Sequence, residues 1–495
     1  MGVIQRQGIK QSIVFLLGAV IGGLNTIFIF TYAFQPNEIG LIRVFQDAAI
    51  LVTSFIILGS SGLTIRFFPK FKDKDSGHHG FLSLILTMTG IGSLIFLLFV
   101  LGFKDQIIDF YRDRSPLISQ YYYWLLPVAI GLSLSGQLQQ YSSNFLRLTV
   151  PVIISQFIKP LMTILALAYV WHWITFSQVV HVFSLWYLVG VLILIFYIRY
   201  LGEWHINLNW RKFIDRKLFK EMSTYALFGL LVSSSNNLIF KADTIMLASM
   251  TDLKLAGIYS IPAFIASMLL IPTNSIISVS SPIISQAFHD HDFTEINTIY
   301  KKTSLNLSII GLLFILLITA SIGDLFDIMP HGDLYRVGIP VVYLLLFARL
   351  FDMITSVNNE IIGYSKHYKI SFYLVMVSGI LNIALNYLLI PKLQILGPAV
   401  ATVLTLFLYN TYKLFFIYRK FGLQPFGKNT HKVFLIAGFV YLLTLIPLDT
   451  GLPLINILVK SAIITFVFVL LTIRWKISPE FTSIFVNLWE RFKPH

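Results

Sequence analysis

Apolar stretches of about 20 residues recur along the chain from Gln11 to Ile473, and short polar hinges separate them. The hydrocarbon core of a bilayer is roughly 30 Å thick, and about 20 helical residues cross it. Because lipid offers no partners to backbone amides, repeated stretches of this length form a helical bundle rather than a barrel. The pattern therefore predicts an all-α polytopic membrane protein.

We expect fourteen transmembrane helices, with boundaries that are soft by a few residues. The predicted ranges are 11–34, 42–66, 79–102, 117–139, 148–172, 177–199, 221–247, 255–279, 303–327, 336–361, 370–390, 395–417, 433–449 and 453–473. An even number of spans leaves both ends of the chain on the same side of the membrane.

The charged residues are few and unevenly distributed. They make up 12% of the chain, against about 25% in soluble domains. If the N-terminus is cytoplasmic, most of the 37 lysines and arginines fall in cytoplasmic hinges, Lys413 among them. The outer hinges then hold only Arg43, Lys104, Arg112, Arg114, Lys254, Arg336 and Lys392. This bias predicts cytoplasmic termini, and it explains the net charge of +14 by the membrane surface rather than by nucleic acid.

The longest basic cytoplasmic hinge divides the chain into two lobes. We expect an N-terminal lobe of six spans at 1–200, a linker at 201–220, a second lobe at 221–432, two further spans at 433–477 and a cytoplasmic amphipathic helix at 478–495, capped by Ser478. A weak internal repeat supports the division: Glu38–Ile42 and Leu255–Tyr259 share a central glycine and open spans two and eight. Similar halves are typical of alternating-access transporters.

Ionisable residues inside the spans are candidates for the functional site, because charge in a bilayer is costly. Lys159, Lys241 and Arg349 are candidate cavity cations that bind substrate. A structural ion pair is the alternative for Lys159, and neutralisation by Asp352 is the alternative for Arg349, since residues three apart share a helical face. Lys241 and Asp243 are two residues apart and should point to different faces.

Acidic and amide side chains complete the candidate site. Asp47, Asp243, Asp352 and Glu360 are candidate cavity or coupling acids for protons or sodium. Spans seven, eight and ten are rich in polar residues that could line a wet cavity or join helices to one another. Their amides are Asn236, Asn237, Asn274, Asn358 and Asn359.

The residues that several kinds of catalytic or metal-binding site require are absent from the sequence. There is no cysteine, and no phosphate-binding G-x-x-x-x-G-K-[ST] or metal-binding H-E-x-x-H motif is present. His78 and His79 lie in a cytoplasmic hinge without an evident third ligand, so we expect them to be solvated. The sequence predicts no cofactor, no metal and no catalytic group.

Several segments resemble the polysaccharide repeat-unit flippases of bacteria in the MOP superfamily. The opening is similar over Phe34–Leu41, Leu58–Gly62 and Ile65–Pro69, and Asp243–Tyr259 resembles the seventh and eighth helices. The most specific match is Leu381–Pro391 followed by Gly397–Thr402, where Pro398 replaces the usual alanine. In order and spacing, the resemblance covers essentially the whole chain.

The resemblance implies two six-helix lobes around a central cavity, plus two extra helices. It implies a transporter, not an enzyme, that flips undecaprenyl-pyrophosphate-linked oligosaccharide to the periplasmic leaflet of the bacterial inner membrane. Its partners would be this lipid-linked oligosaccharide, the bilayer and the polysaccharide polymerase machinery. Export of lipid II or of drug cations is the alternative within the superfamily. A membrane-embedded glycan polymerase or ligase is a more distant one, because the outer hinges are short.

Overall fold

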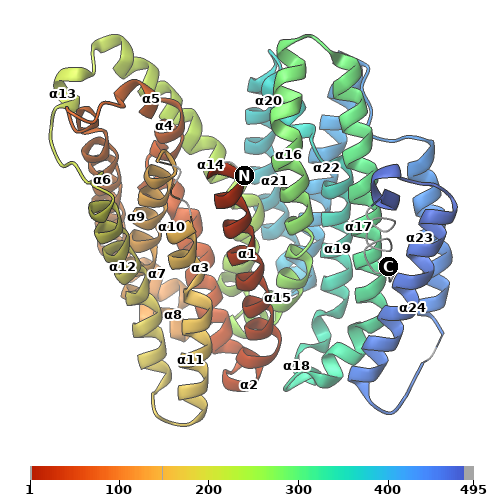
Figure 1. Cartoon of the computed structure of the whole chain (residues 1–495). Helices are drawn as coiled ribbons and strands as arrows, with labels where there is room; N and C mark the ends of the chain where they lie inside the picture. Colours follow the sequence, from red (N-terminus) through yellow and green to blue (C-terminus); the bar gives the residue numbers. More distant parts are fainter. Residues whose placement is uncertain (1–2, 146, 148, 447, 484–495) are drawn as a thin grey trace, which may run out of the picture. The chain divides into compact units, whose positions relative to one another are not determined.

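The computed structural model describes residues 3–145, 147, 149–446 and 448–483, and every regular element in that part of the chain is a helix (Figure 1). The first half contains α1 (Val3–Leu24), η1 (Asn25–Ile29), α2 (Phe30–Ala33), α3 (Pro36–Ile56), α4 (Ser60–Arg66), α5 (Phe68–Phe71), η2 (His78–Gly80), α6 (Phe81–Gly102), α7 (Lys104–Tyr111), α8 (Pro116–Tyr121), η3 (Tyr122–Trp124), α9 (Leu125–Ser143), α10 (Thr149–Gln156), α11 (Ile158–Val170), α12 (Phe176–Tyr200) and α13 (Trp210–Phe213). The second half contains α14 (Arg216–Met250), α15 (Leu253–Ser267), α16 (Leu270–His289), α17 (Phe293–Ile328), α18 (Gly332–Tyr335), η4 (Arg336–Gly338), α19 (Ile339–Thr355), α20 (Asn358–Tyr364), α21 (Tyr368–Leu393), α22 (Leu396–Phe421), α23 (Lys428–Thr444) and α24 (Pro453–Arg474).

The polytopic all-α fold predicted from hydropathy is confirmed. Within the described residues, 12 helical segments are long and apolar enough to cross a membrane. They match twelve of the predicted spans. The other two predicted spans are also helices, but α14 is rich in polar residues and α23 has only 17 residues. The total of fourteen stays a prediction.

Local sequence sets where several spans begin. Pro36 occupies the first turn of α3, where its missing N–H costs nothing, and the Gln35 N–H donates to Glu38 Oε2 at 2.9 Å. Asp215 caps α14 by accepting a hydrogen bond from the Leu218 N–H at 2.7 Å. At the chain end, Ser478 Oγ accepts one from the Phe481 N–H at 3.2 Å, as predicted. The expected amphipathic helix lies mostly at 484–495, outside the described residues.

The predicted tenth span, 336–361, is not one continuous helix. It comprises η4, α19 and α20, and the chain breaks at Ser356, which has φ of 41°. A positive φ interrupts the hydrogen-bond ladder at a serine that follows the apolar part of the span. The polar residues 355–359, which hydropathy placed inside a helix, therefore sit at a break between two helices.

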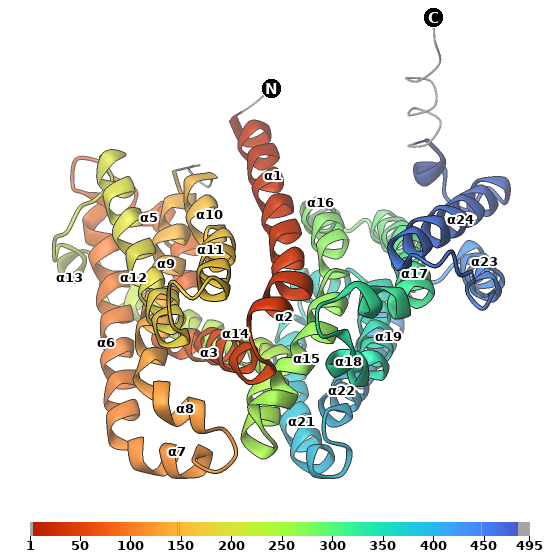
Figure 2. The ribbon, with the colours of Figure 1, turned by 90° about the horizontal axis from the view of Figure 1, so that it is seen from below.

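The chain forms two compact units. Unit 1 comprises residues 1–260 and 375–398, and unit 2 comprises 261–374 and 399–495. In unit 1, α4, α5, α6, α9, α12 and the start of α14 surround an aromatic core that contains Phe68, Phe71, Phe81 and Tyr141. In unit 2, α17 packs against α19, α23 and α24, and Figure 2 shows α23 beside α24. The predicted lobe boundaries stay a prediction.

Two glycines allow α3 and α15 to cross closely within unit 1. A Cβ at Gly40 would collide with the Leu253 carbonyl and lie 3.2 Å from Gly257 N. Conversely, a Cβ at Gly257 would collide with the Pro36 carbonyl and lie 3.1 Å from Gly40 N. The contact is reciprocal, and these are the two glycines of the repeated pentapeptides. The repeat thus marks a point where matching segments of the chain meet.

This crossing predicts that bulk at either glycine is destabilising. Gly40→Val and Gly257→Val should each lower the melting temperature of the detergent-solubilised protein by several degrees, because overpacking costs about 1–3 kcal/mol. Gly90→Val is the matched control, since a Cβ there meets nothing within 4 Å. A melting temperature at Gly40→Val equal to that of the control would contradict the crossing.

Candidate binding site within the membrane spans

An ion pair inside the spans joins α3 to α14 in unit 1. Lys241 Nζ lies 2.7 Å from Asp47 Oδ1, and the side chains are 32% and 13% exposed. Asn237, one turn earlier on α14, donates to the Ile50 carbonyl at 3.1 Å and to Ser54 Oγ at 2.9 Å. Asn237 and Lys241, one turn apart on α14, therefore both face α3. Asp47 and Lys241, both singled out from the sequence, are direct partners.

Arg43 adds a second cation to this pair. It lies one helical turn before Asp47 on α3, interacts electrostatically with it, and donates through Nη2 to Thr26 Oγ1 at 3.0 Å. Arg43 was counted with the outer hinges because it lies at the edge of the predicted span 42–66. This was wrong, because α3 begins at Pro36 and Arg43 lies about two turns inside it. The spacing of Arg43 and Asp47, four residues apart on one helix, was the available signal.

Lys159 lies on α11 beside α1. Its Nζ donates to Gln156 Oε1 at 2.7 Å, and Arg43 acts on it electrostatically. A Cβ at Gly22 of α1 would lie 3.4 Å from the Lys159 side chain, so the glycine makes room for the lysine. Because Gln156 is neutral, this hydrogen bond orients the ammonium group without cancelling its charge.

A π-helical segment fixes the backbone around Lys159. In η1, which interrupts the first span, Asn25 donates to the Lys159 carbonyl at 2.7 Å and accepts from Thr163 Oγ1 at 2.7 Å. Thr26, the next residue, is the partner of Arg43. Such bulges often mark functional sites. Here the bulge places Asn25 against the backbone of Lys159 and Thr26 against the guanidinium group of Arg43.

We call Lys159, Arg43, Asp47 and Lys241 the unit 1 charge cluster. It holds three cations and one carboxylate, drawn from α3, α11 and α14, and none of its members is fully buried. The excess positive charge at membrane depth creates a potential that attracts anions. Phosphate oxygens are the ligands that lysine and arginine bind most strongly.

Asp243 belongs to a separate, buried network. It is 5% exposed, and it accepts hydrogen bonds from Tyr259 OH at 2.9 Å and from Asn386 Nδ2 at 2.8 Å. Asn386 also donates to Asn382 Oδ1 at 3.0 Å. Lys241 and Asp243 therefore face different elements, as their spacing predicted. The two asparagines of Leu381–Pro391 were not singled out individually, although that segment carried the clearest family resemblance.

Unit 2 carries its own polar cluster around the break between α19 and α20. Asp352 accepts from Asn410 Nδ2 at 2.9 Å, and Asn359 accepts from Tyr409 OH at 3.1 Å and from Lys413 Nζ at 3.3 Å. Half-buried Arg349 lies one turn before Asp352 on α19, and Glu360 is within electrostatic range of Asp352 and Lys413. Asn358 accepts a hydrogen bond from Tyr300 OH.

Sequence reasoning missed Lys413 in unit 2, together with its neighbours Tyr409 and Asn410. Lys413 was assigned to a cytoplasmic hinge, but it lies within α22, is only 2% exposed, and places Nζ 3.7 Å from the centre of the Tyr409 ring. The predicted span 395–417 already contains Lys413, but the charge was counted with the cytoplasmic segments because it lies near the end of that span. The remaining predicted amides, Asn236 and Asn274, are exposed on their helices.

His78 is a further correction. The sequence analysis expected a solvated side chain, whereas the ring is 3% exposed, and its Nε2 lies 2.8 Å from Glu203 Oε2. The partner comes from the hinge that follows α12, some 125 residues later in the chain. Sequence spacing could not reveal a neighbour that only folding brings close.

Comparisons with known proteins agree with this architecture. A family model described as polysaccharide biosynthesis protein matches residues 9–288, and a MatE model matches residues 230–388. No curated protein matches the sequence. The structure of the lipid II flippase MurJ in an inward closed conformation is similar with a TM-score of 0.71 at 14% identity, covering 94% of this chain and 99% of MurJ.

Two states of a multidrug resistance MATE transporter of the MOP superfamily are also similar. The inward-facing structure has a TM-score of 0.62 and the outward-facing one 0.54, both at 14% identity. They cover 85% of this chain and 95% and 97% of their own chains. At this identity the likeness establishes the fold.

The unit 1 charge cluster predicts that Asp47 is needed to offset its cations. Asp47→Asn should destabilise the solubilised protein, because it leaves Lys241 without its carboxylate inside the spans. Adding Lys241→Met should recover much of the loss, giving a coupling of about 0.5–3 kcal/mol by thermal melting. Asp109→Asn, which breaks the exposed pair with Arg112, is the control and should change little. Additive effects of the two substitutions would refute the coupling.

Proposed function

The chain belongs to the polysaccharide biosynthesis protein family of MOP-superfamily flippases, and we propose that it flips undecaprenyl-pyrophosphate-linked oligosaccharide repeat units by alternating access. Transport runs from the cytoplasmic to the periplasmic leaflet of the bacterial inner membrane and serves O-antigen or capsule synthesis. The protein acts as a transporter and catalyses no covalent step. The polysaccharide polymerase machinery is its expected partner.

The unit 1 charge cluster is the observation that carries this proposal. A pyrophosphate with a polar glycan cannot cross hydrocarbon unaided, because its charges would lose their hydration. Three cations against one carboxylate, held by helices of unit 1, offer a replacement for that hydration. Lys159 and Arg43 supply donors for phosphate oxygens, while the glycan needs hydroxyl and amide partners.

Asp47 gives the cluster a means of releasing its cargo. With no cargo bound, its carboxylate holds Lys241 at 2.7 Å. An arriving phosphate competes for the same ammonium group, so binding and release exchange one anion for another. Lys241 therefore keeps a counter-charge whether or not cargo is bound, which helps to keep the empty carrier stable. In unit 2, we assign the role of substrate-binding cations to Arg349 and Lys413.

Export of cationic drugs is the second candidate, favoured by the MatE match over 230–388. That range contains Asp243, Asp352 and Glu360, which are also our candidate coupling acids. Two of them already accept hydrogen bonds from asparagine side chains, Asp243 from Asn386 and Asp352 from Asn410. Their oxygens are thus partly occupied, which favours proton or sodium coupling over the binding of a bulky cation.

Removal of a cluster cation tests the proposal. In a host that lacks its own repeat-unit flippase, Lys159→Ala should reduce surface glycan at least about tenfold, since a charge-assisted hydrogen bond contributes roughly 1.5–3 kcal/mol. Lys159→Arg should retain export, and Arg349→Ala should lower it. Exposed Lys392→Ala is the control, with membrane insertion checked for every variant. Full export by both alanine variants would refute the assigned sites.

The wild-type chain tests the substrate independently of these sites. It should restore surface glycan in the same host, but it should not rescue loss of the lipid II flippase or raise resistance to cationic drugs. Rescue of peptidoglycan synthesis alone would point to lipid II. Drug resistance without glycan export would favour the cation exporter.

The absence of native cysteine allows a direct test of orientation. With cytoplasmic termini, Arg112→Cys should react with a membrane-impermeant maleimide in spheroplasts, whereas Lys217→Cys should react only after permeabilisation. Both positions are exposed. Arg112 lies in the turn that follows α7, and Lys217 lies in the first turn of α14. The reverse labelling pattern would overturn the proposed topology.

A further inference from the structure

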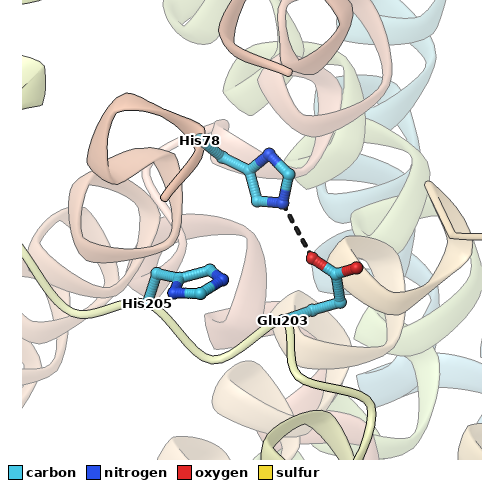
Figure 3. A group of neighbouring side chains, drawn as sticks. All are labelled: His78, Glu203 and His205. Carbon is cyan, nitrogen blue, oxygen red and sulfur yellow. Dashed lines mark hydrogen bonds and ion pairs between the residues drawn. The ribbon is translucent and has the colours of Figure 1, made fainter. Parts of the chain in front are cut away.

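Two hinges of unit 1 meet beside the aromatic core and bring three metal-ligating side chains together. His78 opens η2, between α5 and α6, while Glu203 and His205 lie in the hinge between α12 and α13 (Figure 3). Each residue offers a ligand atom, and these atoms lie within 4.8 Å of one another. None of the three contributes to the unit 1 charge cluster.

His78 is buried, Glu203 and His205 are partly buried, and two ring nitrogens of the group lack hydrogen-bond partners among the described residues. His78 is 3% exposed, and the Glu203 side chain is 15% exposed. The His78–Glu203 contact uses His78 Nε2 and one carboxylate oxygen. Among the described residues, His78 Nδ1 and His205 Nε2 are buried without a hydrogen-bond partner. A buried imidazole nitrogen is costly to leave unpaired, and an ion or ordered water is the usual explanation.

The surrounding chain holds the two hinges in this register. Gly77 has a positive φ of 61°, which favours glycine. A Cβ atom at this position would lie only 3.0 Å from the His205 side chain, so glycine also allows the two hinges to approach each other. Asn207 N–H donates to Ser83 Oγ at 2.9 Å, and Tyr141 OH donates to the Glu203 carbonyl at 3.1 Å. Backbone and side-chain hydrogen bonds therefore fix both hinges independently of the three candidate ligands.

The walls of the group are aromatic. The rings of Phe68 and Phe145 lie 5.3 and 5.6 Å from the His78 ring, centre to centre. A low-dielectric wall strengthens the attraction between an ion and its ligands. On one side a pocket of about 700 Å³ reaches His78 and Glu203, so water has access to the site.

We propose that His78, Glu203 and His205 bind one divalent transition-metal ion, with zinc the best match to two imidazoles and a carboxylate. Zinc binds nitrogen at about 2.0–2.1 Å and carboxylate oxygen at about 2.0–2.2 Å, in tetrahedral geometry. Ligand atoms around a tetrahedral zinc ion lie about 3.3 Å apart, so the three atoms, which lie within 4.8 Å of one another, must adjust to that spacing on binding. Water from the pocket completes the coordination.

The ion would join the hinge between α5 and α6 to the hinge between α12 and α13. The ion would bind His205 Nε2, which has no hydrogen-bond partner among the described residues. The hydrogen bond between His78 and Glu203 does not involve this atom. Magnesium and calcium prefer all-oxygen ligand sets and should not compete. The proposal is independent of the transported cargo.

Metal binding is tested with the full-length protein in detergent, purified through an affinity tag that contains no histidine. After chelator treatment and dialysis, isothermal titration with zinc should give one site per chain, and zinc should raise the melting temperature. Magnesium should do neither. His205→Ala and Glu203→Gln should each weaken zinc binding at least about tenfold. Loss of a residue that only hydrogen-bonds to a metal ligand already has an effect of that size.

The control is His289→Ala, whose side chain is 83% exposed. It should bind zinc as the wild type does. Glu203→Gln nearly preserves shape, so its melting temperature without zinc shows whether the fold is intact. Absence of a one-to-one site in the wild type, or equal zinc affinity in His205→Ala and His289→Ala, would overturn the proposal.

Discussion

A charged side chain inside a membrane span must find its partner within the protein, because hydrocarbon supplies none. This constraint explains the contacts of unit 1. Asp47 forms an ion pair with Lys241, Thr26 accepts a hydrogen bond from Arg43, and Gln156 accepts one from Lys159. The helices that carry these residues are thereby fixed against one another. The same groups leave an excess of positive charge, which is the basis of the proposed binding of an anionic cargo.

The three polar clusters within the spans differ in how far their charges are engaged by neighbouring groups. Asp243 is enclosed by Tyr259 and Asn386, and Lys413 lies against Tyr409 beside Asn359. Such enclosed groups favour structural or coupling roles. The unit 1 charge cluster is only half-buried, and the neutral partner of Lys159 leaves its charge uncancelled. The proposed roles therefore differ with burial and with the charge of each partner, rather than with depth in a span.

Much of the architecture could be predicted because hydropathy reports a physical requirement of the bilayer. The helices that match predicted spans are apolar over the length that a membrane demands. Errors arose at helix ends, where a hinge and a polar helical turn look alike. Arg43 and Lys413 were assigned to hinges for that reason, and the break at Ser356 was missed because residues 355–359 continue an apolar segment without proline or glycine.

The sequence alone determined that the chain is a helical membrane protein, that Lys159, Lys241 and Arg349 lie within helices of the spans, and which family it resembles. These properties depend on local composition and on the order of motifs. Only the tertiary structure decided that Lys241 meets Asp47, that Asn386 meets Asp243, and that His78 meets Glu203. Each pair is separated by more than 120 residues, and such contacts depend on how whole helices pack, which no local pattern encodes.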